Sequence, residues 1–248
     1  MKYRWSLLLA FGLTCVSVFA TQVVSPQKEE EAWTKWSKKQ AEKMLTDSPW
    51  SQRQTDTDTS EMFFSPTSDP NLTGRKPAND DARLKEGATN QSTNVSYVLR
   101  FFSARPVRRA LVRLMELQTN PTPEVIERLH NFANVKADES IIITVTAEST
   151  DQRSLRAVMQ SIDSAITSTL KNETYLERDG KRLFLEEYIP PGKDGFGARF
   201  IFLRTLDEKP FIADNTGEVR FHAKFPNGPS IDRRFKVSAM IYNGVLEY

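Results

Sequence analysis

The chain is poor in the side chains that build most metal sites and covalent catalysts. Its 248 residues include one cysteine, Cys15, and two histidines, His130 and His222. The histidines are far apart and form no His-x-x-x-His pattern, which would place two ligands on one helix face. A Gly-x-Ser-x-Gly motif is also absent. We therefore expect no metal site and no cofactor, and the sequence identifies no catalytic residue.

Long apolar runs are absent after residue 20. Residues 5–19 are uncharged and mostly apolar, they follow Lys2 and Arg4, and they end beside Ala20. Such a run is short for a membrane span, which needs about 20 residues. A basic start, an apolar run and a small-x-small end predict a signal peptide over residues 1–20, cleaved after Ala20. The expected location is secreted or periplasmic, and an uncleaved leader is the only membrane contact we expect.

An excess of one charge is also missing. The chain has 34 Lys and Arg against 32 Asp and Glu, and loss of the leader removes Lys2 and Arg4. The remaining chain is neutral overall, so composition gives no support to nucleic-acid binding. Removal of Cys15 with the leader also excludes disulfides and thiol chemistry.

Tryptophan is concentrated in residues 21–50. The pattern predicts an amphipathic helix over residues 28–46, with acidic residues first, basic residues later, and Trp33 and Trp36 on one stripe. Asp47-Ser48-Pro49 ends it, and Trp50 follows. Large aromatic groups of this kind anchor partner grooves, so Trp33, Trp36 and Trp50 are candidate partner-binding residues. The alternative is that the helix packs on its own domain and completes the core.

Residues 51–94 contain few large apolar side chains. A segment of this composition does not bury enough apolar area to offset its ordering entropy, so we predict a disordered linker. Residues 95–248 are the predicted folded domain, of the α+β class. The expected order is β-α-α-β-α followed by antiparallel strands, with the helices on one face of the sheet and the disordered linker before it.

Turn motifs set part of the strand pairing. Asp179-Gly180 and Asn243-Gly244 are two-residue hairpin signals. The first predicts that Glu177 faces Arg182. Between residues 219 and 237, a five-residue loop over 226–230 keeps apolar side chains on one face. This register pairs Phe221 with Phe235, and on the other face His222 with Arg234.

The polar face of that hairpin is the second candidate partner-binding surface. Its residues are Arg220, His222, Lys224, Arg234 and Lys236. A basic face of this kind suits an anionic partner such as an acidic protein surface, a polyanionic glycan or lipid headgroups; the alternative is an ordinary solvated sheet face. A further candidate is an arginine group that suits carboxylates or phosphates, with surface ion pairing as its alternative. It comprises Arg100, Arg105, Arg108, Arg109 and Arg113.

A short stretch resembles other proteins. Trp33-Thr34-Lys35-Trp36, Ala41-Glu42-Lys43-Met44-Leu45 and Asp47-Ser48-Pro49-Trp50 are similar to the opening of a group of secreted bacterial proteins of unknown function. The resemblance implies a bacterial exported protein and carries over no catalytic residue.

Two function classes follow. The first is a non-enzymatic exported module that binds an unknown protein or an anionic surface, with the tryptophan helix as a tethered docking element. The alternative is a cofactor-free secreted hydrolase acting on glycan or cell-wall substrates through carboxylates such as Glu148, Glu186 or Glu187. A cavity in which two of these carboxyl groups converge would favour the hydrolase.

Overall fold

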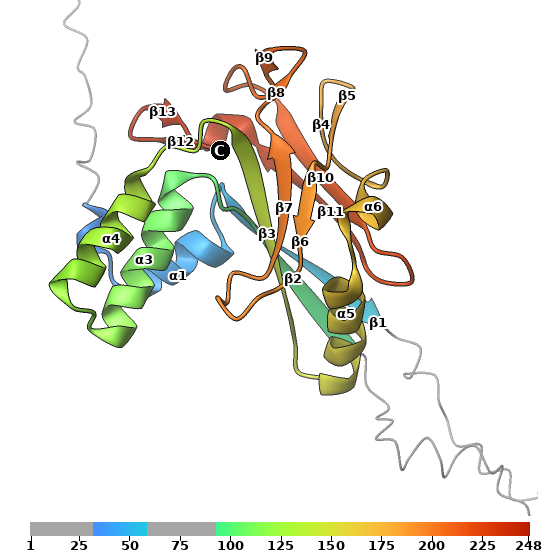
Figure 1. Cartoon of the computed structure of the whole chain (residues 1–248), viewed down its shortest axis with the longest axis horizontal. Helices are drawn as coiled ribbons and strands as arrows, with labels where there is room; N and C mark the ends of the chain where they lie inside the picture. The colour runs from blue at the N-terminus through green and yellow to red at the C-terminus, as the bar shows by residue number, and fades with distance from the viewer. Residues whose placement is uncertain (1–31, 59–92) are drawn as a thin grey trace, which may run out of the picture. The chain divides into compact units, whose positions relative to one another are not determined.

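A computed structural model describes residues 32–58 and 93–248 (Figure 1). The predicted signal peptide and linker residues 59–92 lie outside the described residues. The helices are η1 (Trp33–Lys35), α1 (Lys38–Thr46), α3 (Arg105–Thr119), α4 (Pro123–Asn134), α5 (Gln152–Ser164), α6 (Thr167–Leu170) and η2 (Val237–Ala239). None of the helices in these two ranges is both long and apolar enough to cross a membrane.

The strands form two main antiparallel sheets and two short hairpins. Sheet A has the order β1-β2-β3-β7-β6, and sheet B has the order β11-β10-β4-β5. Their bounds are β1 (Ser51–Asp58), β2 (Thr93–Phe101), β3 (Ser140–Ser149), β4 (Thr174–Arg178), β5 (Lys181–Phe184), β6 (Glu187–Ile189), β7 (Ala198–Leu203), β10 (Glu218–Lys224) and β11 (Ser230–Lys236). The hairpins are β8 (Thr205–Leu206) with β9 (Lys209–Pro210), and β12 (Ile241–Tyr242) with β13 (Val245–Leu246). The α+β class with antiparallel strands is confirmed, and the expected single sheet is divided in two.

The two sheets share one core of phenylalanine rings. Phe101 of sheet A lies edge-on to Phe235 of sheet B, with ring centroids 4.8 Å apart. Phe200 meets Phe221 at 5.2 Å, and all four rings are buried. Alternation along each strand places these rings on one face because successive side chains point to opposite sides. Burial of one such side chain stabilises the fold by about 1.5–3 kcal/mol.

The edges of the two sheets are joined on both sides. At one side, the Gln54 amide of β1 donates to Ser230 O at 2.8 Å and accepts from Asp232 N at 2.8 Å, so it bonds the edge of β11. At the other, Leu185 N bonds Thr174 O of sheet B and Glu186 N bonds Ile201 O of sheet A. At these points, backbone groups at the edges of the two sheets are therefore hydrogen-bonded and do not remain unpaired.

The predicted helix over 28–46 begins later than expected. Ser37 caps α1 and forms a capping box with Gln40, so the regular helix starts at Lys38, and Trp33 lies in the separate turn η1. The helix α5 is capped by Asp151, whose side chain accepts from Arg153 N and Ser154 N. In Figure 1, α1, α3 and α4 lie together, and contacts join α1 to α3 and α3 to α4.

The linker prediction is wrong for residues 51–58. These residues form β1, which pairs with β2 from Ser51↔Arg100 to Asp58↔Thr93. Most β1 side chains are exposed or half-buried, and Ser51 alone in this strand is buried. An edge strand gains backbone hydrogen bonds from its neighbour and needs few apolar side chains, so composition did not reveal it.

The register of the β10–β11 hairpin also differs from the prediction. His222 faces Asp232 and Arg220 faces Arg234, a shift of two residues that keeps the predicted faces. Phe225 N bonds Pro229 O at 3.0 Å and Gly228 N bonds Phe225 O at 3.1 Å, so the loop covers residues 226–228 and is two residues shorter at its C-terminal end than predicted. The shift places a carboxylate beside His222, where the predicted register placed a second cation.

Candidate binding surface

The candidate surface is the face of sheet B that points away from the core. We call it the outer face. Its side chains come from alternate positions of four strands: Tyr175, Glu177, Arg182, Phe184, Glu218, Arg220, His222, Lys224, Ser230, Asp232, Arg234 and Lys236. All five basic residues of the predicted surface lie on it, so the structure brings that group together.

Asp232 is the centre of the polar network on the outer face. Its carboxylate accepts from Arg220 Nε at 2.9 Å and from Arg220 Nη2, and it lies 3.0 Å from His222 Nδ1. The hydrogen bonds from Arg220 first, and that from His222, lower the pKa of Asp232, while the same contact raises the pKa of Arg220. Two of the five predicted basic residues, Arg220 and His222, are therefore engaged within the sheet.

Tyr175 lies between a ring and a guanidinium. Its ring is stacked on His222, with centroids 5.0 Å apart and 28° between planes, and Arg182 lies 4.3 Å from its centroid. Arg182 also donates to Glu177 at 2.9 Å. Because Tyr175 is buried by these neighbours, the exposed aromatic ring of the outer face is Phe184, at 47% exposure.

Three cations remain at the surface. Lys224, Arg234 and Lys236 are exposed. Arg234 lies 3.7 Å from Glu218, and both side chains are more than half exposed, so this pair contributes little. Lys224 and Lys236 have no ion pair among the described residues. The outer face is thus a neutralised centre beside three exposed positive charges.

The three predicted tryptophans are not at the surface. Their exposed fractions are 9% for Trp33, 9% for Trp36 and 4% for Trp50. Trp33 packs edge-on to His130 at 4.8 Å, and Trp50 Nε1 donates to Glu247 O at 2.7 Å. The prediction of a tethered docking element is therefore wrong. This segment is part of the domain's core, and its three tryptophans are buried.

The predicted arginine group has internal partners. Arg108 is buried and donates to Ser103 O and Val135 O, and its burial lowers its pKa. Arg105 pairs with the buried Glu247, and Arg113 donates to Trp36 O at 2.8 Å. The remaining two act alike: Arg100 donates to Leu45 O and Arg109 to Asn134 Oδ1. These arginines hold helices and strands together through backbone carbonyl and side-chain oxygens, most of them distant in sequence, so the sequence alone did not reveal the pairing.

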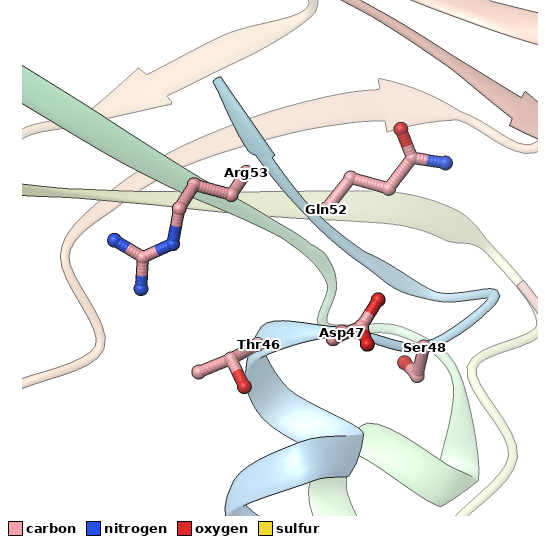
Figure 2. Close-up of a pocket in the computed structure, with 5 residues that line it drawn as sticks. All are labelled: Thr46, Asp47, Ser48, Gln52 and Arg53. Carbon is pink, nitrogen blue, oxygen red and sulfur yellow. The ribbon is translucent and has the colours of Figure 1, made fainter. Parts of the chain in front are cut away.

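A hollow beside the end of α1 and the start of β1 contains no converging catalytic groups. This hollow has a volume of about 570 Å³, and Thr46, Asp47, Ser48, Gln52 and Arg53 line it (Figure 2). Gln52 and Arg53 are neighbours on a strand and point apart, and Arg53 is engaged with Glu148 at 2.9 Å. No pair of groups converges there for acid–base chemistry.

A second hollow of about 430 Å³ lies beside α3 and α4. It is lined by Thr34, Arg113, Glu116, Asn120, Pro121, Ile126 and His130. Glu116 is held by Arg113 at 3.1 Å and by His130 at 2.6 Å. The carboxylates proposed for a hydrolase, Glu148, Glu186 and Glu187, line neither this hollow nor the others described here. The hydrolase alternative gains no support.

Comparisons with known proteins add no family. No family model, curated protein or solved structure matches the chain. Within residues 32–58 and 93–248, no group of three or more His, Cys, Asp or Glu side chains is arranged to hold a metal ion. Sequence reasoning found the cations of the outer face but missed the roles of Asp232, Tyr175 and Gln54. The strand register places both Asp232 and Tyr175 opposite His222. The β10–β11 part of this register depends on the loop geometry, so the sequence alone did not give the correct pairing.

Proposed function

We propose that this chain is an exported, non-enzymatic module that binds the acidic surface of a partner protein through its outer face. One observation carries the proposal: Lys224, Arg234 and Lys236 are exposed beside a network in which Asp232 and Glu177 are already engaged by arginines. Export rests on the sequence of residues 1–20.

A protein partner suits this face better than a glycan or a lipid surface. Interfaces between proteins are rich in aromatic residues and arginine at their centre and polar at their rim. Phe184 at 47% exposure, beside Arg182, supplies an aromatic anchor, and the three cations supply a rim that steers an acidic partner. The stacked Tyr175 has both ring faces covered, so it offers no platform for a sugar ring.

The test uses a defined peptide as a probe. Fluorescence anisotropy would follow binding of an Asp- and Glu-rich peptide with one phenylalanine, and of its Asn and Gln analogue. We expect the acidic peptide alone to bind, more weakly at high salt because exposed charges are screened. The variant K224E/R234E/K236E should lose at least about tenfold in affinity, about 1.4 kcal/mol.

A matched variant controls for net charge. R128E/K171E/K193E makes the same charge change at exposed positions outside the outer face. It should bind the acidic peptide as the unmodified chain does. Equal loss in both variants, or equal binding of the neutral peptide, would show that the outer face has no specific role and overturn the proposal.

A further inference from the structure

A third cavity lies away from the outer face, between two hairpins at one end of the domain. The turn between β4 and β5 and the hairpin β8–β9 lie side by side at the top of Figure 1, and residues from both line the cavity. Its volume is about 380 Å³, within the roughly 300–1,000 Å³ range of small-molecule sites. Its lining residues are Arg178, Asp179, Lys181, Leu206, Asp207, Lys209, Pro210, Phe211, Ala213 and Asp214.

Arg178 is fixed in the wall of this cavity. Its side chain is 5% exposed, and Nη2 donates to Asp214 Oδ1 and to Thr216 O. Nε lies 3.4 Å from Asp179 Oδ2. The hydrogen bonds from Thr216 first, then from Arg178, lower the pKa of Asp214 to about 2, so its carboxylate stays charged and keeps the guanidinium in place. The arginine is thereby oriented before any ligand arrives.

One edge of that guanidinium has no partner. Nη1 makes no hydrogen bond among the described residues, and it is not among the buried polar atoms. Nε is buried without a hydrogen bond, so Nη1 is the guanidinium nitrogen that remains for a molecule in the cavity. A guanidinium nitrogen with free N–H groups matches the planar oxygens of a carboxylate.

The lining carries three basic and three acidic side chains, and the groups among them without an ion pair have an excess of one positive charge. Lys181 and Lys209 line the cavity and have no ion pair among the described residues. Asp179 and Asp214 are engaged with Arg178, which leaves Asp207 as the one carboxylate of the lining without an ion pair in this part of the chain. The lining groups without an ion pair among the described residues are therefore two lysines and one aspartate, which favours an anionic ligand by one charge.

Part of the wall is apolar. Leu206, Pro210, Phe211 and Ala213 contribute it, and Phe211 is 8% exposed. Phe211 N donates to Arg204 O at 3.0 Å, and this hydrogen bond fixes the backbone of Phe211 beside the cavity. A ligand that contacts both the basic and the apolar residues of the lining needs an anionic end and a compact apolar group.

From this arrangement we infer that the cavity binds a small organic carboxylate with a compact apolar group. The carboxylate lies toward Arg178 Nη1 and the two lysines, and the apolar group lies on Leu206 and Phe211. The site is separate from the outer face, so neither proposal depends on the other.

The test follows backbone amide resonances of the isotope-labelled chain by NMR. Benzoate is the probe, benzamide its neutral analogue, and acetate the anion without an apolar group. We expect saturable shifts at Lys181, Lys209 and Phe211 with benzoate at low millimolar concentration, and at least about tenfold weaker binding of the other two. No saturable shift with benzoate, or equal binding of benzamide, would overturn the inference.

Paired variants separate this site from the outer face. K181M/K209M should weaken benzoate binding by at least about tenfold, whereas K224M/K236M should leave it unchanged. Both variants remove two exposed positive charges. Equal weakening in the two variants would mean a general charge effect and no built site. Benzoate binding by the unmodified chain, together with no binding of the acidic peptide to that same chain, would show that the proposed function failed while this site exists.

Discussion

The indole N–H of Trp50 donates to the backbone carbonyl oxygen of Glu247 at 2.7 Å, across 197 positions of the chain. The Glu247 side chain in turn accepts from Arg105 N at 3.2 Å and Arg105 Nε at 2.6 Å. Trp50 also lies edge-on to Tyr242, with ring centroids 6.1 Å apart. One tryptophan thus connects the segment before β1, the start of α3 and the last strands.

Replacement of Trp50 by phenylalanine tests this connection. The change keeps an aromatic ring but leaves the buried Glu247 carbonyl without its donor, so we expect unfolding free energy to fall by about 1–3 kcal/mol for the lost bond. Urea unfolding measures it. Trp36→Phe is the matched control, because Trp36 is also buried but its indole N–H has no hydrogen bond among the described residues. Equal losses in the two variants would contradict the role of the bond.

The Gln54 side chain is predicted to protect the edge of β11. Gln54→Ala leaves Ser230 O and Asp232 N without their partners, so we expect a loss of about 1–2 kcal/mol and about tenfold faster hydrogen exchange at the Asp232 amide. Gln52→Ala is the control, since the Gln52 side chain makes no hydrogen bond among the described residues. Unchanged exchange at Asp232 in Gln54→Ala would show that the edge is protected by other means.

Two glycines of one loop are expected to respond differently to alanine. Gly197 has φ +82°, and an added Cβ would lie 2.3 Å from the Val145 carbonyl oxygen, so Gly197→Ala should cost more than about 3 kcal/mol. Gly195 has φ +75° with nothing within 4 Å of its added Cβ, so only backbone strain of about 1 kcal/mol applies. Thermal unfolding of both variants compares them. Similar melting temperatures would mean that β3 and this loop separate easily.

Acid sensitivity is expected from Asp214. Its pKa of about 2 in the folded chain is below the unfolded value near 3.9. The unfolded chain therefore binds this proton first, and the stability that Asp214 supplies is present above about pH 4 and lost as pH falls through about 2. Stability of Asp214→Asn should vary less with pH across that window. Asp207→Asn, in the nearby turn, is the control and should keep the pH profile of the unmodified chain.

Several local features could be predicted because neighbouring residues determine them. The Asp179-Gly180 turn places Glu177 opposite Arg182, and Asn243-Gly244 joins Tyr242 to Val245, as expected. Asp179 and Asn243 adopt positive φ, which such two-residue turns require. Alternation along β10 likewise assigned Phe221 to the core and Arg220 to the outer face.

Other features were decided only by the tertiary structure. The strand β1 was missed because its stability comes from backbone bonds to β2 across a long sequence gap, which composition does not encode. The two-residue shift in the β10–β11 pairing depends on how the Phe225–Pro229 loop closes, and it created the Asp232–His222 contact. The sequence by itself determined which side chains alternate and where turns fall, because those depend on adjacent residues. Burial of Trp50 and Glu247 was decided by contacts between distant segments, whose geometry exists only in the folded chain.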